Sequence, residues 1–290
     1  VLYVFHLYIV KRALFMKNLA MPCIKCKTLW LSDIHLGSKD SQVEHLISLL
    51  NSIECEKIFL LGDIIDLWSM KRKFWWPLIH YQVVQMLFKM SQSGTRVIYI
   101  PGNHDATMRE YVSSLIGGIE IMEEAIHTTA AGKKLLLVHG DCFDEHILVG
   151  RLAKFIGNFG YPFLLWVNRN ILKFTSFLGY RHWSLASYIK NRIKGAREAI
   201  ETFENAAVSE VKRRKLDGII CGHIHQPDLK LKDGVIYCND GDWVEHCTAI
   251  IEESSGNLKL LDCTSLSMGS DSKPSAANDS HCEVYSNVKK

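Results

Sequence analysis

Three apolar runs of β-forming residues, each followed by a polar turn that contains glycine, constrain the fold of this chain most. The runs read KTLWL, KIFLL and RVIYI, and the turns after them read SDIHLGS, GDIIDLW and PGNHD. Segments with helical spacing of apolar residues separate the runs, which is typical of βαβ units whose parallel strands are covered on both faces. We therefore predict an α/β fold in which the polar turns meet at the carboxyl edge of a sheet.

The rest of the chain divides into a second strand-rich part and an insertion. A further buried run, KKLLLVHGD, precedes a stretch without strand-like alternation, and strand signals return in LDGIICGHIHQP, GVIYCNDGDW and CTAIIEES. We predict one domain over residues 27–264, with a helical cap inserted at about 145–215. Residues 1–26 are set apart as an extension, because the methionines within it are equally good starts. The polar, Ser-rich residues 265–290 are predicted to be a disordered tail.

Charge and cysteine usage exclude several classes of protein. The formal net charge of +3 over 290 residues is too small to indicate a nucleic-acid partner, and the basic run Lys212–Lys215 ends a predicted helix, where cations complement the helix dipole. The 9 cysteines are odd in number and scattered through apparent strands, which is typical of a reducing cytoplasm. Cys23 and Cys26 form a CxxC without a second pair at zinc-finger spacing, so we expect no metal or redox role for them. These features predict a cytoplasmic protein.

Five strand-end turns carry residues that can bind metal ions. A mixture of carboxylate, amide oxygen and imidazole suits Mn²⁺, Fe²⁺ or Zn²⁺, and one shared carboxylate, here Asp63, can bridge two ions. A single Asp, Asn or His on a turn more often caps a helix or forms a local hydrogen bond. The ordered series DxH, GDxxD, GNHD, HGD and GHxH makes that explanation implausible for the whole set. The candidate ligands are Asp33, His35, Asp63, Asn103, His139, His223 and His225.

The series DIHLG, GDIIDLW, GNHD, HGD and GHIH resembles that of the calcineurin-like metallophosphoesterase superfamily, over roughly residues 27–260. The resemblance implies a four-layer α/β/β/α sandwich with a helical cap and a site for two divalent ions, for which Mn²⁺ is the first expectation. It implies that one ion is held by Asp33, His35, Asp63 and His225. It implies that the other ion is held by Asp63, Asn103, His139 and His223.

The same resemblance implies a phosphoesterase in which an activated water attacks phosphorus. His104 is placed to protonate the leaving oxygen, or to stabilise its charge without proton transfer, and both roles stay open. Asp105 is expected to fix the tautomer of His104. Asn103, His104 and His223 are also candidate contacts to the substrate. Lys194 is a further candidate for a substrate phosphate, although a solvated helix charge is the favoured reading.

Within the superfamily, GDIIDLW and the insertion are most similar to the UDP-2,3-diacylglucosamine pyrophosphatase group of lipid A biosynthesis. That group implies cleavage of a nucleotide-lipid to UMP and a diacylated sugar phosphate, with a helical lid over the acyl chains. The apolar insertion FIGNFGYPFLLWVNRNILKFTSFLGYRHW suits an acyl groove or contact with the cytoplasmic face of the inner membrane. An ordinary amphipathic pair of helices packed on the sandwich remains the alternative.

One position departs from this group. His104 follows Asn103 where the best-known branch has Arg, and His is the residue common in general phosphoesterases. Another substrate, such as a nucleotide, a phosphodiester or a phosphoprotein, therefore stays open. A non-catalytic scaffold with the same fold is disfavoured, because all seven expected ligand positions are filled.

Overall fold

The computed structural model describes residues 24–146, 194–265 and 283–285. Most of the predicted cap, the extension 1–23 and most of the predicted tail lie outside the described residues. The first strand begins at Ile24, so the domain starts three residues earlier than predicted and includes Cys26, which is buried. Residues Glu283–Tyr285, within the segment predicted as a disordered tail, form a short strand at the edge of a sheet.

The larger sheet has the strand order β13-β12-β11-β1-β2-β3-β5-β4. Its centre is parallel, as the strand-turn-helix rhythm predicted, whereas β11, β12 and β13 pair antiparallel beside β1. The strands are β1 (Ile24–Leu31), β2 (Ile53–Leu61), β3 (Arg96–Ile100), β4 (Leu115–Ile116), β5 (Ile119–Ile121), β11 (Thr248–Glu252), β12 (Leu258–Asp262) and β13 (Glu283–Tyr285).

The smaller sheet has the order β6-β7-β8-β10-β9, with β7, β8 and β10 parallel and the two edge strands antiparallel. Its strands are β6 (Ala125–Thr128), β7 (Lys134–Leu137), β8 (Gly218–Cys221), β9 (Asp228–Lys232) and β10 (Val235–Asn239). Every residue of β8 is buried, which explains why GIIC is apolar throughout rather than alternating.

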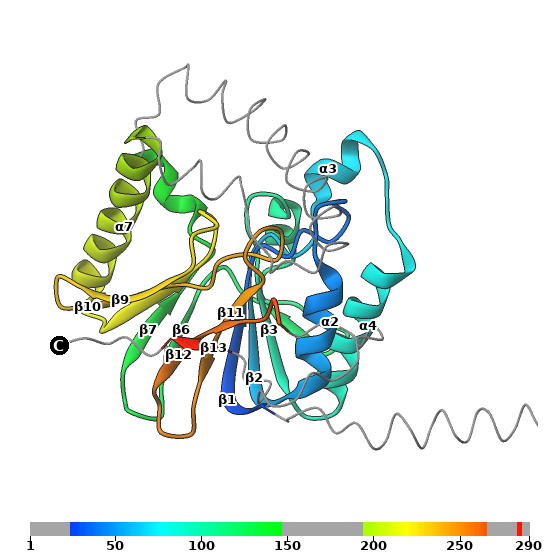
Figure 1. Cartoon of the computed structure of the whole chain (residues 1–290), viewed down its shortest axis with the longest axis horizontal. Helices are drawn as coiled ribbons and strands as arrows, with labels where there is room; N and C mark the ends of the chain where they lie inside the picture. Colours follow the sequence, from blue (N-terminus) through cyan, green and yellow to red (C-terminus); the bar gives the residue numbers. More distant parts are fainter. Residues whose placement is uncertain (1–23, 147–193, 266–282, 286–290) are drawn as a thin grey trace, which may run out of the picture.

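Three separate apolar cores establish the layers. The two sheets face each other across a core that includes Trp30, Phe59 and Ile220. Helices α2 (Val43–Ser52) and α4 (Leu78–Gln92) cover the outer face of the larger sheet, and α7 (Lys194–Arg214) covers the smaller one. This confirms the predicted α/β/β/α sandwich (Figure 1).

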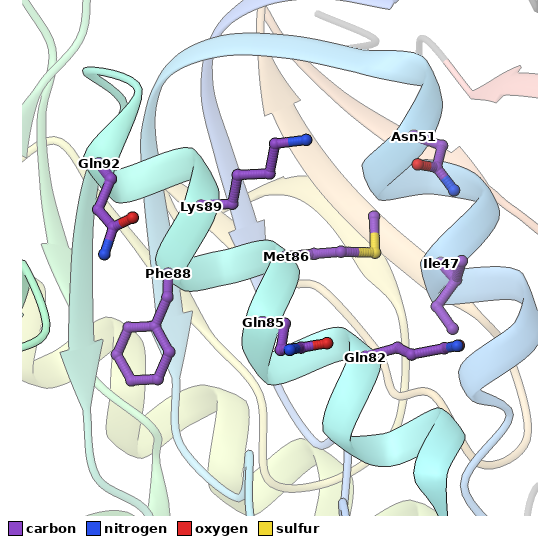
Figure 2. Close-up of a pocket in the computed structure, with 8 residues that line it drawn as sticks. All are labelled: Ile47, Asn51, Gln82, Gln85, Met86, Phe88, Lys89 and Gln92. Carbon is purple, nitrogen blue, oxygen red and sulfur yellow. The ribbon is translucent and has the colours of Figure 1, made fainter.

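Three short helices, α3 (Leu67–Arg72), η1 (Ala106–Tyr111) and η2 (Asp141–His146), follow strands β2, β3 and β7 and surround the strand ends. A shallow groove of about 600 Å³ lies instead on the helix layer, between α2 and α4 (Figure 2). Its lining is rich in amides, including Asn51, Gln82 and Gln85, and contains none of the candidate ligands. None of the helices in the described part of the chain is both long and apolar enough to cross a membrane.

Candidate metal centre

The candidate ligands all lie in turns after strand ends, and five of the seven have an unusual backbone conformation. Asp33 and His35 follow β1, Asp63 follows β2, and His223 and His225 follow β8. These five residues have φ values of 49°, 53°, 53°, 72° and 51°, in the left-handed region that residues other than glycine rarely adopt. Such strain costs about 1–3 kcal/mol per residue and is typical of functional sites.

One group of ligand atoms gathers around Asp33. The Oδ1 atom of Asp33 lies 3.1 Å from Nε2 of His225 and 3.8 Å from Nε2 of His35. His35 Nε2 also lies 4.0 Å from Oδ2 of Asp63. Carboxylate and imidazole atoms at these separations can share one ion in their midst. The structure therefore brings together the four residues predicted for one ion.

A second group shares the same Asp63 oxygen. Asp63 Oδ2 lies 3.4 Å from Nε2 of His139, and that nitrogen lies 3.2 Å from Oδ1 of Asn103. The other ring nitrogen of His139, Nδ1, bonds to the carbonyl of Leu61 at 2.8 Å, which leaves Nε2 as the ligand atom. Asp63 thus lies between the two groups, in the position expected of a bridging carboxylate.

His223 is a predicted ligand whose Nε2 contacts a residue outside the two ligand groups. Its ring lies 5.1 Å from that of His139, but its Nε2 bonds to Oδ1 of Asp144 at 2.8 Å. Asp144 belongs to η2 and is largely exposed. His223 would have to exchange this partner to bind an ion. Lys194 is the first residue of α7 and directly follows residues 147–193 in the sequence, which lie outside the described residues.

Two observations show that the residues fit a pair of cations. Asp33 Oδ1 and His35 Nε2 are buried, and neither has a hydrogen-bond partner among the described residues, although buried polar atoms nearly always have one. A Cβ atom added to Gly102 would overlap the Asp63 carboxylate, and one added to Gly222 would overlap the Asp33 carboxylate. The backbone therefore packs directly against the ligands and holds them in place.

The electrostatics of the site also favour positive charge. Burial on its own would raise the pKa of Asp63 and lower that of His139. Their attraction outweighs burial, so the pKa of Asp63 is lowered to about 2 and that of His139 is raised to about 10. The pKa of His35 is likewise raised well above its ordinary value against the effect of burial, through its contacts with Asp33 and Asp66. A site that stabilises protonated imidazoles so strongly is suited to hold metal cations.

His104 faces the same site but is held by a residue other than the one predicted. Its Nδ1 atom lies 2.9 Å from Oδ1 of Asp66, and its ring lies 4.7 Å from that of His35. The carboxylate of Asp105 instead accepts hydrogen bonds from the backbone of Gly102, at 2.6 Å, and of Ile64, at 2.8 Å. The prediction that Asp105 fixes the tautomer of His104 is thus corrected. Asp105 braces the turn that carries Asn103, and Asp66 orients His104.

Comparison with known proteins agrees with this geometry. The family model described as calcineurin-like phosphoesterase matches residues 26–227. The chain belongs to this family. It is therefore a metal-dependent phosphoesterase, and the two ligand groups around Asp63 are the candidates for its ions.

Two curated relatives of this phosphoesterase have the same name. UDP-2,3-diacylglucosamine hydrolase from Edwardsiella ictaluri is 27% identical over 79% of this chain and 89% of its own length. The protein of the same name from Pseudomonas fluorescens is 24% identical over 81% of this chain and 94% of its own length. Among solved structures, Vacuolar Protein Sorting 29 from Cryptosporidium parvum is 14% identical, at a TM-score of 0.41, over 81% of this chain and 90% of that one.

Several residues that support the centre of this phosphoesterase were not predicted from the sequence. Arg109, in η1, bonds to Asp141 at 2.7 Å and so ties the turn after β3 to the turn after β7. Asp242, fully buried after β10, lies 3.7 Å from His225 Nδ1 and 2.6 Å from His246 Nδ1. Asp66 is the second Asp of the GDxxD motif and Asp242 follows Gly241 after β10, so polar turns after strands also marked these two residues.

Proposed function

We propose that this phosphoesterase hydrolyses UDP-2,3-diacylglucosamine to UMP and 2,3-diacylglucosamine 1-phosphate, with two divalent ions for which Mn²⁺ is the first candidate. The observation that carries the hydrolytic part is the position of Asp63, whose Oδ2 is shared by both ligand groups. The substrate is supported by the names of the relatives that match most of their own length. It is also supported by the apolar character of residues 155–183 in the sequence.

Bound divalent ions would supply hydroxide at neutral pH and offset charge on the phosphoryl oxygens. The protein's own residues then have distinct tasks. Asp33 and Asp63 hold the ligand groups together, and the backbone N–H of His104 donates to Oδ1 of Asp63 at 2.8 Å, which fixes that carboxylate. Asn103 contributes a neutral oxygen, so the site gains a ligand without further negative charge.

His104 is the candidate general acid. Its Nδ1 bonds to Oδ1 of Asp66, so its Nε2 is the nitrogen available to the departing oxygen. Trp68 packs edge-on against the ring at 5.1 Å and limits its rotation. His104 thus combines a fixed orientation with a carboxylate partner, which is what a proton donor to the leaving group requires.

A substrate series tests the proposal. The purified full chain with Mn²⁺ is expected to release UMP from UDP-2,3-diacylglucosamine in detergent and to act far more slowly on UDP-N-acetylglucosamine, which lacks the two long acyl chains. The Asp63→Asn variant is the control for a contaminating activity. Equal rates on the two UDP-sugars, or no UMP release from the acylated one, would reject the assignment.

A second candidate function is that of a phosphodiesterase or nucleotide phosphoesterase with the same metal chemistry. It is suggested by His104, which occupies the position where the best-known branch of the UDP-2,3-diacylglucosamine pyrophosphatase group has Arg. That function predicts fast hydrolysis of bis-p-nitrophenyl phosphate or of a nucleotide, with no gain from acyl chains. A higher kcat/KM for these soluble esters than for the acylated UDP-sugar would favour it.

A further inference from the structure

Exposed apolar and basic side chains cluster along α3, the loop after it and the first turn of α4. Trp68 is 55% exposed, Phe74 73%, Leu78 72% and Tyr81 47%. Between them in the sequence lie three consecutive exposed cations, Lys71, Arg72 and Lys73. We call these seven residues the α3–α4 ridge.

The ridge is not explained by packing within the described part of the domain. Helix α3 buries none of its residues, whereas α4 buries His80, Val83 and Leu87 against the larger sheet. Single exposed apolar residues are common on proteins, but four large ones within fourteen positions are unusual for a surface that only faces water.

The charges of the ridge all have the same sign. Residues 67–81 contain no Asp or Glu, and none of the three cations forms an ion pair with another described residue. The guanidinium of Arg72 lies over the Trp68 ring, 5.4 Å from its centre, so that a cation and an aromatic ring share one surface. Aromatic rings together with cations that have no ion-pair partner among the described residues complement the interface of an anionic bilayer, where rings enter the headgroup region and cations meet phosphates.

The ridge also adjoins the metal centre. Trp68 contacts the ring of His104, and α3 follows β2 at the strand-end side of the sandwich (Figure 1). A surface on which the ridge rests would therefore meet the molecule beside the candidate general acid.

We propose that the α3–α4 ridge docks this phosphoesterase on the surface of an anionic phospholipid bilayer. The purpose of such docking rests on the proposed function, because a diacylated substrate resides in a membrane and the enzyme must reach it from the membrane surface. The ridge is distinct from the cap contact predicted from the sequence, which concerns residues outside the described ones.

Vesicle co-sedimentation of the full chain tests the inference. The wild type is expected to bind vesicles of phosphatidylcholine mixed with phosphatidylglycerol and to bind pure phosphatidylcholine weakly. The variant Lys71→Gln/Lys73→Gln should weaken binding to the anionic vesicles by about 10- to 30-fold, and high salt should mimic it. Phe74→Gln/Leu78→Gln should weaken binding by at least about 10-fold.

Matched controls separate the ridge from general surface effects. Leu115→Gln removes an equally exposed apolar side chain, and Lys212→Gln/Lys215→Gln removes two cations at the end of α7. Both control variants should bind as the wild type does. The inference would be overturned if the control variants lost as much binding as the ridge variants, or if the ridge variants bound as well as the wild type. It would also be overturned if the wild type did not bind the vesicles, as expected if another part of the chain or a protein partner occupies the ridge. UMP release in detergent tests the proposed function independently, since it needs no bilayer.

Discussion

Asp66 accepts from His104 at 2.9 Å and caps α3 through the backbone N–H of Ser69 at 2.8 Å, so one carboxylate orients the candidate acid and anchors the helix beside it. Hydrogen bonds from His104, His35 and Ser69 keep the pKa of Asp66 far below its ordinary value although burial opposes this. The carboxylate is thus charged throughout the pH range in which His104 would act.

Asp66→Asn should therefore damage catalysis more than folding. Asn keeps the capping oxygen but removes the carboxylate that holds Nδ1 of His104, so we expect kcat to fall by about 10²-fold or more. The loss should be larger for an alkyl phosphodiester than for a p-nitrophenyl ester, whose leaving group needs no proton. Bound metal, measured by elemental analysis, should stay unchanged. A uniform loss across leaving groups together with loss of metal would contradict the assigned role.

Asp63→Asn should remove metal and activity together. The substitution removes the one carboxylate that both ligand groups share and leaves Asp33 as the only carboxylate among the seven candidate ligands, so we expect fewer than two Mn²⁺ per chain and turnover at the background rate. Asp233→Asn, which changes an exposed carboxylate paired with Lys212, is the matched control. An Asp63→Asn protein that retained two ions would show that the bridge lies elsewhere.

His80 should make stability depend on pH. Its buried Nδ1 accepts from the N–H of Gly37 at 2.8 Å, two residues after His35, and burial lowers its pKa below the ordinary 6.5 despite the nearby Glu44. Because the folded pKa is the lower one, the stabilisation is complete above pH 6.5 and is lost as the pH falls through the folded pKa.

In His80→Asn, the amide oxygen can replace Nδ1 without titrating. Urea unfolding at about pH 7.5 and about pH 5.5 should show the wild type losing about 1 kcal/mol more of its free energy of unfolding than this variant. Equal losses would mean that His80 does not titrate between these two values.

Glu252 should be critical for holding the two sheets together. Its buried carboxylate accepts from Thr28 at 2.9 Å and from the N–H of Ala130 at 2.6 Å, and it bonds to His127 of the other sheet at 2.7 Å. Glu252→Ala leaves all three groups without this partner, so we expect a loss of about 3–5 kcal/mol in the free energy of unfolding. Glu253→Ala, at the half-buried neighbour paired with Lys259, should cost about 1 kcal/mol or less.

The parts of this molecule that the sequence predicted best are those determined by local pattern. Buried strands with glycine-containing turns at their ends are local features, and the rule that parallel strands share a carboxyl edge was enough to bring Asp33 and Asp63 together. His139 follows β7 of the smaller sheet, so its place beside them depends on how the two sheets pack, which that rule does not predict. Asp63 was expected between the two groups because one shared carboxylate can bridge two ions and because the family resemblance implied it. The antiparallel return of β11 and β12 beside β1 was not predicted, because strand partners far apart in the chain leave no local signal.

Contacts made by individual side chains were harder to predict. Asp105 was expected to orient His104 because the two are adjacent, but neighbours on a tight turn point in different directions. Asp105 turns inward to Gly102 and Ile64, and Asp66, 38 positions before His104, takes the predicted role. The pairing of His223 with Asp144 could not be predicted either, since it depends on how η2 folds back over the strand ends.

The left-handed backbone at Asp33, His35, Asp63, His223 and His225 limits how this centre could be transplanted. Copying the seven side chains onto another α/β scaffold would not reproduce it, because strand ends of ordinary conformation would aim the same carboxylates and imidazoles elsewhere. An engineer would have to move whole turns, glycines included. For the same reason, replacement of one of these five residues by Val or Ile should disturb its turn as well as remove a ligand atom, since branched side chains tolerate that backbone least.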